Sequence, residues 1–263
     1  GDGRRDSTEL VSILNDAVLQ KCDANDGIRD GVINNPQSCD FDPRSDLSDK
    51  MCPISGGNGA CFTNAQIQTI SDFYSGPYDS NGTVIYPGKT KGSELDWIGL
   101  FVPNSSNDMA PGMLRGPAGD HVNYLFYEND PGVTIPNLND PNYRARQDGM
   151  NPEFHWMDFS VDDFTSGQAE LMSSIMDATD PDLSSFLKSR GGKLIVYHGL
   201  SDALSVSTAT INYFNDMVDA TFAGSFSDAN DATRLFLAPG MGHCGGGPGP
   251  NNWDKLLPLV VWV

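Results

Sequence analysis

The sequence predicts an α/β protein with a doubly wound parallel sheet, and the last seventy residues carry this prediction. The segments "KLIVYHG" (193–199) and "TRLFLAPG" (233–240) are short apolar runs ending in or near glycine, as buried parallel strands do. Residues 205–220 between them have a helical pattern, and residues 251–263 begin another helix. The order strand, helix, strand, helix is typical of a doubly wound sheet, whose functional residues lie on loops after the strands.

The rest of the chain predicts a few helices and one long irregular stretch. Residues 6–21 predict an amphipathic helix, because apolar side chains recur on one face and Asp6 can cap its start. Residues 63–75 and 181–190 predict shorter helices. Residues 76–165 are rich in Pro, Gly, Asn and Asp with poor periodicity, so we expect an insertion with few regular elements there.

The composition favours a secreted protein and opposes two classes of partner. The 263 residues include 35 Asp and Glu against 16 Lys and Arg, a formal net charge of −19. Binding to nucleic acid or to an anionic membrane surface needs clustered cations, so we expect neither. No apolar run approaches the length of a membrane span. Two N-glycosylation sequons, at Asn81 and Asn104, are compatible with secretion.

The five cysteines indicate an oxidising compartment, since none has the CxxC spacing of a metal site. Cys22 and Cys39 bracket an acidic loop, so a bridge between them is plausible. A small disulfide loop is also expected from residues 52–61, "CPISGGNGAC". Cys244 is then the odd cysteine, and we expect it to pair with something outside this chain.

An acid and a base are predicted at the ends of the two strands. His198 and Asp202 follow the first strand, and His243 follows the second. The last two members of an α/β-hydrolase triad have this order, because the histidine must reach a nucleophile with one ring nitrogen and a carboxylate with the other. The alternative is an ordinary surface aspartate and an ordinary loop histidine.

The nucleophile of such a triad is not apparent. No G-x-S-x-G motif occurs, and "GLSDA" (199–203) lacks the final glycine. The first residues do not resemble a natural start, and the last ones end within an apolar run. We therefore expect an internal piece of a longer protein, with the nucleophilic serine upstream of Gly1.

The acidic loop of residues 22–39, "CDANDGIRDGVINNPQSC", predicts a calcium site. Asp23, Asp26 and Asp30 offer hard oxygen ligands in a glycine-containing loop, and carbonyls between them can add more. The loop is not an EF-hand, because Asn34 stands where the bidentate glutamate belongs. The alternative is an acidic turn closed by a disulfide.

Four stretches resemble the tannase and feruloyl esterase family of secreted α/β hydrolases. Residues 22–39 resemble the family's calcium loop between paired cysteines, and residues 41–66, "FDP" to "CFTNAQ", resemble the segment that enters its lid. "YHGLSDALSV" (197–206) resembles the block bearing the acid, and "PGMGHCGGGPGP" (239–250) the His-Cys block. The resemblance covers essentially the whole chain, as the downstream half or more of such an enzyme.

The resemblance implies an α/β-hydrolase fold with a large irregular lid insertion, whose nucleophile-bearing part is missing from this chain. Residues 1–40 would be a hydrolase segment with the calcium loop, residues 41–190 the lid, and residues 191–263 the segment carrying the acid and the base. The lid residues that are candidates for contact with an aryl group or carboxylate are Trp97, Arg144, Phe154 and Trp156. Aromatic residues of this kind more often fill a lid's own core.

The resemblance also implies roles for individual residues. His243 would be the general base and Asp202 its orienter. Cys244 would be bonded to a cysteine immediately before the catalytic serine, so that the upstream part of the same enzyme is its partner. The ligands implied for a structural Ca²⁺ are the side chains of Asp23, Asp26 and Asp30 and the carbonyls of Ile28 and Val32.

The implied reaction is hydrolysis of small aromatic esters of plant cell-wall or tannin origin by a serine-type esterase. The "GHCGGGPG" block is nearer to the feruloyl esterase branch than to fungal tannases, so feruloyl esters are expected first. Galloyl esters and mono(hydroxyethyl) terephthalate are the alternatives. An alternative from another functional class is an inactive, calcium-stabilised module that binds phenolic or polysaccharide ligands. The absence of a serine motif permits it, whereas Asp202, His243 and Cys244 favour the enzyme.

Overall fold

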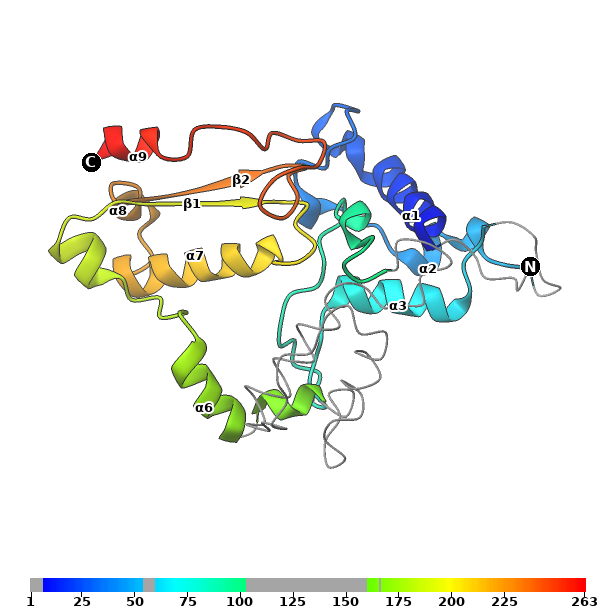
Figure 1. Ribbon diagram of the computed structural model, residues 1–263, viewed down its shortest axis with the longest axis horizontal. Coiled ribbons are helices and arrows are strands. Elements are labelled where there is room, and N and C mark those ends of the chain that lie inside the picture. Colours follow the sequence, from blue (N-terminus) through cyan, green and yellow to red (C-terminus); the bar gives the residue numbers. More distant parts are fainter. Residues whose placement is uncertain (1–6, 54–59, 103–159, 166) are drawn as a thin grey trace, which may run out of the picture.

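The computed structural model describes residues 7–53, 60–102, 160–165 and 167–263, and these residues contain a two-stranded parallel sheet. Strands β1 (Leu194–Gly199) and β2 (Thr233–Ala238) pair in register from Leu194 opposite Thr233 to Gly199 opposite Ala238. The crossover between them consists of α7 (Ser207–Phe222) and the short α8 (Phe226–Ala229). Figure 1 shows α7 running along the two strands. The predicted strand–helix–strand unit is therefore present.

The prediction of buried strands is wrong for most of this sheet, since only Gly199, Thr233 and Ala238 are buried. Val196 and Leu235 pack with a core cluster that includes Met217 and Val218 of α7. On the opposite face, Tyr197 and Phe236 are 41% and 54% exposed. Successive side chains of a strand point to opposite faces, and among the described residues the crossover helices cover only one of them. Tyr197 makes an edge-to-face contact with the ring of Trp253, which shields that face in part.

A second core forms around the two N-terminal helices. Helix α1 (Ser7–Cys22) occupies the predicted position, while its expected cap, Asp6, lies outside the described residues. Helix α3 (Asn64–Ser75) begins at a capping box, in which Thr63 and Gln66 each accept a backbone amide of the other. Leu14 and Val18 of α1 are almost completely buried in this core.

Three other helical segments depart from the sequence prediction. Helix α6 (Gly167–Met176) was not anticipated, and residues 181–190 form only one π-helical turn, Ser185–Ser189. Helix α9 (Leu257–Trp262) begins later than residue 251, with Pro258 in its first turn. The remaining elements are η1 (Asp23–Asp26), η2 (Pro36–Ser38), α2 (Pro43–Asp46), η3 (Ser48–Lys50), η4 (Glu94–Trp97) and η7 (Val161–Thr165).

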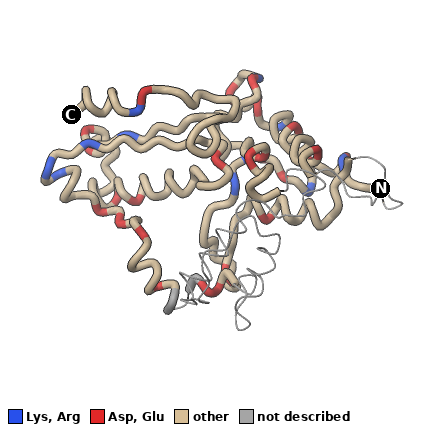
Figure 2. The backbone as a smooth tube through the Cα atoms, viewed as in Figure 1, with Lys and Arg blue, Asp and Glu red and all other residues tan. Residues whose placement is uncertain are grey.

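Much of the expected lid lies outside the described residues, including Asn104, Arg144, Phe154 and Trp156. The other sequon residue, Asn81, is exposed in a turn. Acidic positions are spread over many elements of the chain and outnumber basic ones (Figure 2). Among the described helices, none combines the length and the apolarity needed to cross a membrane.

Candidate active site

The loops that follow β1 and β2 bring Asp202 and His243 together. The amide of Leu200 donates to Ala238 O at 2.9 Å, and that of Ser201 donates to Met241 O at 3.0 Å, so the two loops leave the sheet side by side. His243 Nδ1 then lies 3.0 Å from Asp202 Oδ2. The Asp202 side chain is 6% exposed and that of His243 is 43% exposed. The acid is thus buried beneath a histidine that remains accessible from outside.

Asp202 is held as a carboxylate by several donors. Its Oδ1 accepts the amides of Leu204 and Ser205 at 2.8 and 2.9 Å. Burial acts to raise the pKa of Asp202, but hydrogen bonds from His198, His243 and the two amides outweigh it and lower the pKa to about 2. Asp202 therefore stays negatively charged near neutral pH.

His198 is a second histidine at the same carboxylate, a role that the sequence did not indicate. It is the fifth residue of β1 rather than a loop residue after the strand, which corrects the prediction. Its Nε2 lies 2.7 Å from Ser205 O and 3.4 Å from Asp202 Oδ2, and its Nδ1 lies 2.7 Å from Thr210 Oγ1. The hydrogen bond with Asp202 raises the pKa of His198 against the opposing effect of burial.

The loop that carries His243 is tightly folded. Cys244 has a φ of 61°, a left-handed conformation that is uncommon for residues other than glycine. A Cβ added to Gly247 would lie 2.1 Å from Gly240 O, so only glycine fits there. Cys244 is exposed and is the one cysteine without a disulfide in the described part of the chain.

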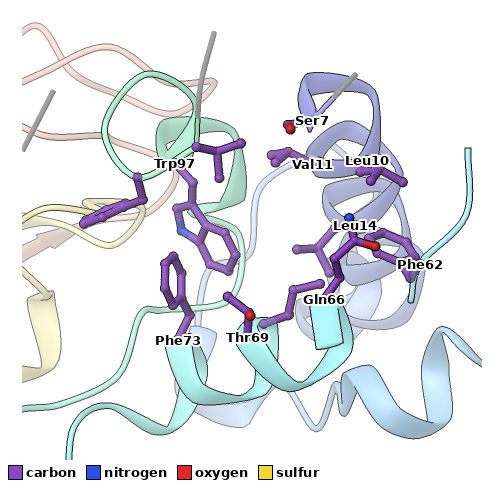
Figure 3. A pocket seen from close by; sticks show the side chains of 12 residues that line it. Ser7, Leu10, Val11, Leu14, Phe62, Gln66, Thr69, Phe73 and Trp97 are labelled. Carbon is purple, nitrogen blue, oxygen red and sulfur yellow. The ribbon is translucent and has the colours of Figure 1, made fainter. Parts of the chain in front are cut away.

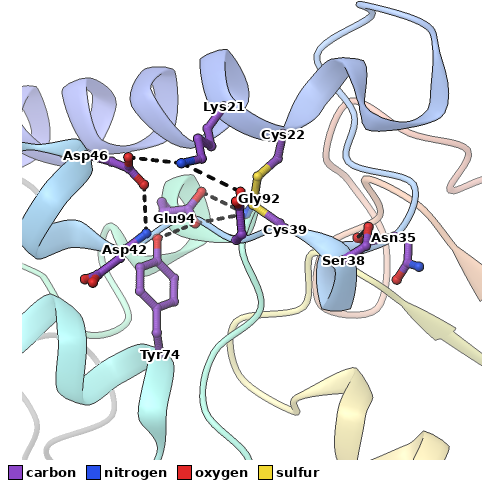
Figure 4. Close-up of a disulfide and its surroundings, with 11 residues drawn as sticks. Lys21, Cys22, Asn35, Ser38, Cys39, Asp42, Asp46, Tyr74, Gly92 and Glu94 are labelled. Atoms are coloured by element: carbon purple, nitrogen blue, oxygen red, sulfur yellow. Dashed lines mark hydrogen bonds and ion pairs between the residues drawn. A yellow bond between two sulfur atoms is a disulfide. The ribbon is translucent and has the colours of Figure 1, made fainter.

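The other four cysteines form the two local disulfides expected from their spacing, Cys22–Cys39 and Cys52–Cys61. The first closes the acidic loop at the end of α1 (Figure 4). Nearby, Lys21 pairs with Asp46 at 3.2 Å on the same side of the helix. The disulfide therefore ties the end of the acidic loop to α1, and the ion pair links α1 to α2.

Within the acidic loop, each candidate carboxylate accepts a backbone amide. Asp23 accepts the amides of Asp30 and Gly31 at 3.2–3.3 Å, and Asp30 accepts that of Val32 at 3.1 Å. Asp26 accepts the Ile28 amide at 2.9 Å and contacts the Asn34 amide group. These two donors lower the pKa of Asp26, which keeps it charged.

The donor chemistry of this loop suits a hard cation, because Asp26 and Asp30 are exposed carboxylates. The described residues nevertheless contain no group of three or more acidic, His or Cys side chains arranged to hold a metal ion. Asp23 is buried, and its carboxylate accepts the amides of Asp30 and Gly31. The residue types suit calcium, but in this structure their side chains are not gathered around one point.

Trp97, one of the lid candidates, is a core residue in this structure. It is 2% exposed, and its ring packs at 5.0 Å from that of Phe73. It also lines an apolar cavity of about 230 Å³ between α1 and α3, shown in Figure 3. The other cavity residues come mainly from these helices and are largely aliphatic or aromatic.

The amino-acid sequence of the chain is similar to those of known esterases and hydrolases. The sequence model of a family described as "Tannase and feruloyl esterase" matches residues 5–263. The chain is 32% identical to the mono(2-hydroxyethyl) terephthalate hydrolase of Piscinibacter sakaiensis, over 96% of this chain and 43% of that protein. It is 29% identical to a probable feruloyl esterase B-2 of Aspergillus terreus, over 98% of this chain and 44% of the relative.

The fold of the chain also resembles those of solved Aspergillus structures. An esterase from Aspergillus oryzae superposes with a TM-score of 0.73 at 25% identity, covering all of this chain and 47% of the esterase. The tannin acyl hydrolase from Aspergillus niger superposes with a TM-score of 0.63 at 22% identity, covering 98% of this chain and 46% of the hydrolase. The chain thus spans less than half the length of these relatives.

Proposed function

The chain belongs to the tannase and feruloyl esterase family, and on this premise we propose that it forms part of a secreted serine-type carboxylic ester hydrolase of the α/β-hydrolase fold that acts on aromatic esters. The observation that carries the proposal is the 3.0 Å contact between His243 Nδ1 and the buried carboxylate of Asp202. With Nδ1 occupied, the Nε2 nitrogen of a half-exposed ring is available to a nucleophile.

The chemistry proposed for this pair is two-step acyl transfer. His243 removes the proton of a serine hydroxyl as its oxygen attacks the ester carbonyl, and then passes that proton to the departing alcohol. In the second step His243 activates a water molecule, which releases the acid and restores the serine. Asp202 fixes the tautomer of the imidazole and stabilises the imidazolium formed in each step.

The nucleophilic serine belongs, in this proposal, to a part of the enzyme outside residues 1–263. Two observations support this: triads of α/β hydrolases follow the chain order serine, acid, histidine, and the chain matches only 43–47% of its relatives. Ser201 is no substitute, because it is buried directly beside Asp202. Cys244, exposed next to His243, is proposed to form a disulfide with that other part.

Feruloyl esters are the substrates that we propose first, with galloyl and terephthaloyl esters as alternatives. The relatives include feruloyl esterases, a terephthalate monoester hydrolase and a tannin acyl hydrolase, all acting on aromatic acyl groups by their names. The two local disulfides support an extracellular location. We also propose that the acidic loop binds a structural Ca²⁺ through Asp23, Asp26 and Asp30 with the carbonyls of Ile28 and Val32.

A turnover panel on the complete protein tests the activity. Methyl ferulate, methyl gallate and mono(2-hydroxyethyl) terephthalate are compared for kcat/KM, with His243→Ala as the inactive reference. We expect hydrolysis of at least one ester and a loss of about 10³-fold or more in the variant. A folded protein that binds these compounds without turnover would instead support the ligand-binding module.

A further inference from the structure

Residues 90–97 contact both of the loops that form the candidate active site. The Thr90 hydroxyl donates to Leu200 O at 2.8 Å, and both residues are buried. Leu200 is two positions before Asp202, so this bond attaches the acid loop to a segment more than a hundred residues away in sequence. We call residues 90–97 the brace.

The other end of the brace contacts the histidine loop through Asp96. The Asp96 carboxylate accepts the backbone amide of His243. It also lies so close to Gly242 that a Cβ there would be 2.3 Å from Asp96 Oδ2. Burial raises the pKa of Asp96, the His243 amide opposes this, and the negative charge of Asp202 adds to the rise. A side chain at position 242 would therefore push this carboxylate away from the histidine loop.

The brace is itself firmly held. The Ser93 hydroxyl donates to Thr90 O at 2.7 Å and accepts the Trp97 indole N–H at 3.2 Å. Glu94 accepts the Tyr74 hydroxyl of α3 at 2.7 Å and the Gly92 amide at 2.9 Å, as Figure 4 shows. These bonds within the brace and to α3 make it a suitable support for the acid and histidine loops that it contacts.

We propose that Asp96 is a positioning residue for His243, and that the brace fixes the acid and base loops relative to each other. The residues around His243 are mostly glycines without side chains that could anchor the loop, so the main-chain bond to Asp96 does so. Asp96 acts through His243 and touches no reacting atom. The catalytic part of this inference rests on the proposed function, whereas the positioning itself does not.

Proton NMR of the complete protein tests the positioning without any substrate. An imidazole N–H bonded to a carboxylate gives a far-downfield resonance, and its absence in His243→Ala assigns the one from His243. We expect this resonance to be lost or broadened in Asp96→Ala and retained in Asp96→Asn, whose side-chain oxygen still accepts an amide. The matched control is Asp254→Ala, which removes an exposed carboxylate that accepts the amides of Leu256 and Leu257.

Kinetics on the best ester of the panel give the second readout. We expect kcat to fall about tenfold or more in Asp96→Ala with KM within about twofold, because a misplaced base slows chemistry rather than binding. Asp96→Asn should recover most of the loss, and Thr90→Val, which removes only the hydroxyl, should lower kcat as well.

Several outcomes would overturn the positioning role proposed for Asp96 and the brace. An unchanged resonance in Asp96→Ala would refute it, and so would an Asp96→Asn variant as impaired as Asp96→Ala. If Asp96→Ala does not fold, the resonance of Thr90→Val decides, and no change there counts against the brace. If the wild-type protein hydrolyses no aromatic ester, the proposed function fails while the NMR result still stands.

Discussion

Glu94 combines complete burial with an ionisable side chain. It has no exposed surface, and its carboxyl group accepts the Tyr74 hydroxyl and the Gly92 amide. Burial raises the pKa of Glu94 from 4.5 to about 7, although these hydrogen bonds and Lys91 act in the opposite direction. A folded-state pKa above the unfolded value means that protonated Glu94 favours folding at low pH. This contribution is lost as the pH rises from about 4.5 through 7.

We therefore expect Glu94→Gln to make the protein more stable than wild type at about pH 8 and to flatten its pH dependence between about pH 5 and 8. The gap between the two pKa values corresponds to about 3 kcal/mol, an upper limit for the gain. The Gln oxygen keeps the bonds from Tyr74 and Gly92. The measurement is the free energy of unfolding in urea at both pH values.

Glu9→Gln is the matched control for this prediction, since Glu9 is an exposed residue in the first turn of α1. The free energy of unfolding of Glu9→Gln should change with pH as that of the wild type does. If Glu94→Gln also shows the wild-type change, Glu94 is not the group that causes the pH dependence.

At the scale of elements, the acidic loop with η1 and η2 is the part whose stability is proposed to depend on a bound Ca²⁺. Without a cation, Asp26 and Asp30 are exposed like charges close together in sequence. A bound Ca²⁺ would neutralise them and stabilise only the folded form. We expect chelation to lower the Tm by about 5–10 °C, from a linkage of roughly 3 kcal/mol at saturating calcium. Scanning calorimetry with EDTA and with added calcium measures this.

The Asp26→Asn/Asp30→Asn variant should have a Tm that no longer responds to EDTA. Asp49→Asn serves as the control, because Asp49 is an exposed aspartate that pairs with neighbouring Lys50 and lies outside the loop. A wild-type Tm that is identical with EDTA and with calcium would contradict the calcium site.

The elements show which parts of the fold follow from local sequence. The apolar stripe of α1, the capping box of α3 and the two apolar runs of the sheet are local signals, and each produced the predicted element. The carboxyl ends of adjacent parallel strands meet at one edge, which is why Asp202 and His243 could be paired in advance. His198, Asp96 and Glu94 could not be assigned, because their roles depend on contacts between segments distant in sequence.

At the scale of the whole molecule, Cys244 is the point where this chain is proposed to join the rest of the enzyme. It is exposed, adjacent to His243, and has no disulfide partner among the described residues. Peptide mapping of the complete protein under non-reducing conditions should find Cys244 in a disulfide with a cysteine outside residues 1–263. A free Cys244 thiol would contradict that link.

Cys244→Ser should then destabilise the complete protein by about 2–5 kcal/mol and lower kcat. The reason is that the loop carrying His243 would lose the disulfide proposed to hold it. The control is the double variant Cys52→Ala/Cys61→Ala, which removes a disulfide of the N-terminal region. It should leave the kcat of the ester hydrolysis nearly unchanged.

The contacts of Thr90 and Asp96 have a consequence for chimeras between this chain and its relatives. A chimera that imports a foreign insertion in order to change substrate preference inherits intact chemistry only if its upstream junction falls after residue 97. A junction placed before residue 90 would replace the Thr90 hydroxyl and the Asp96 carboxylate, which contact Leu200 and Gly242–His243. Residues 90–97 should therefore be kept together with these two loops when the insertion is exchanged.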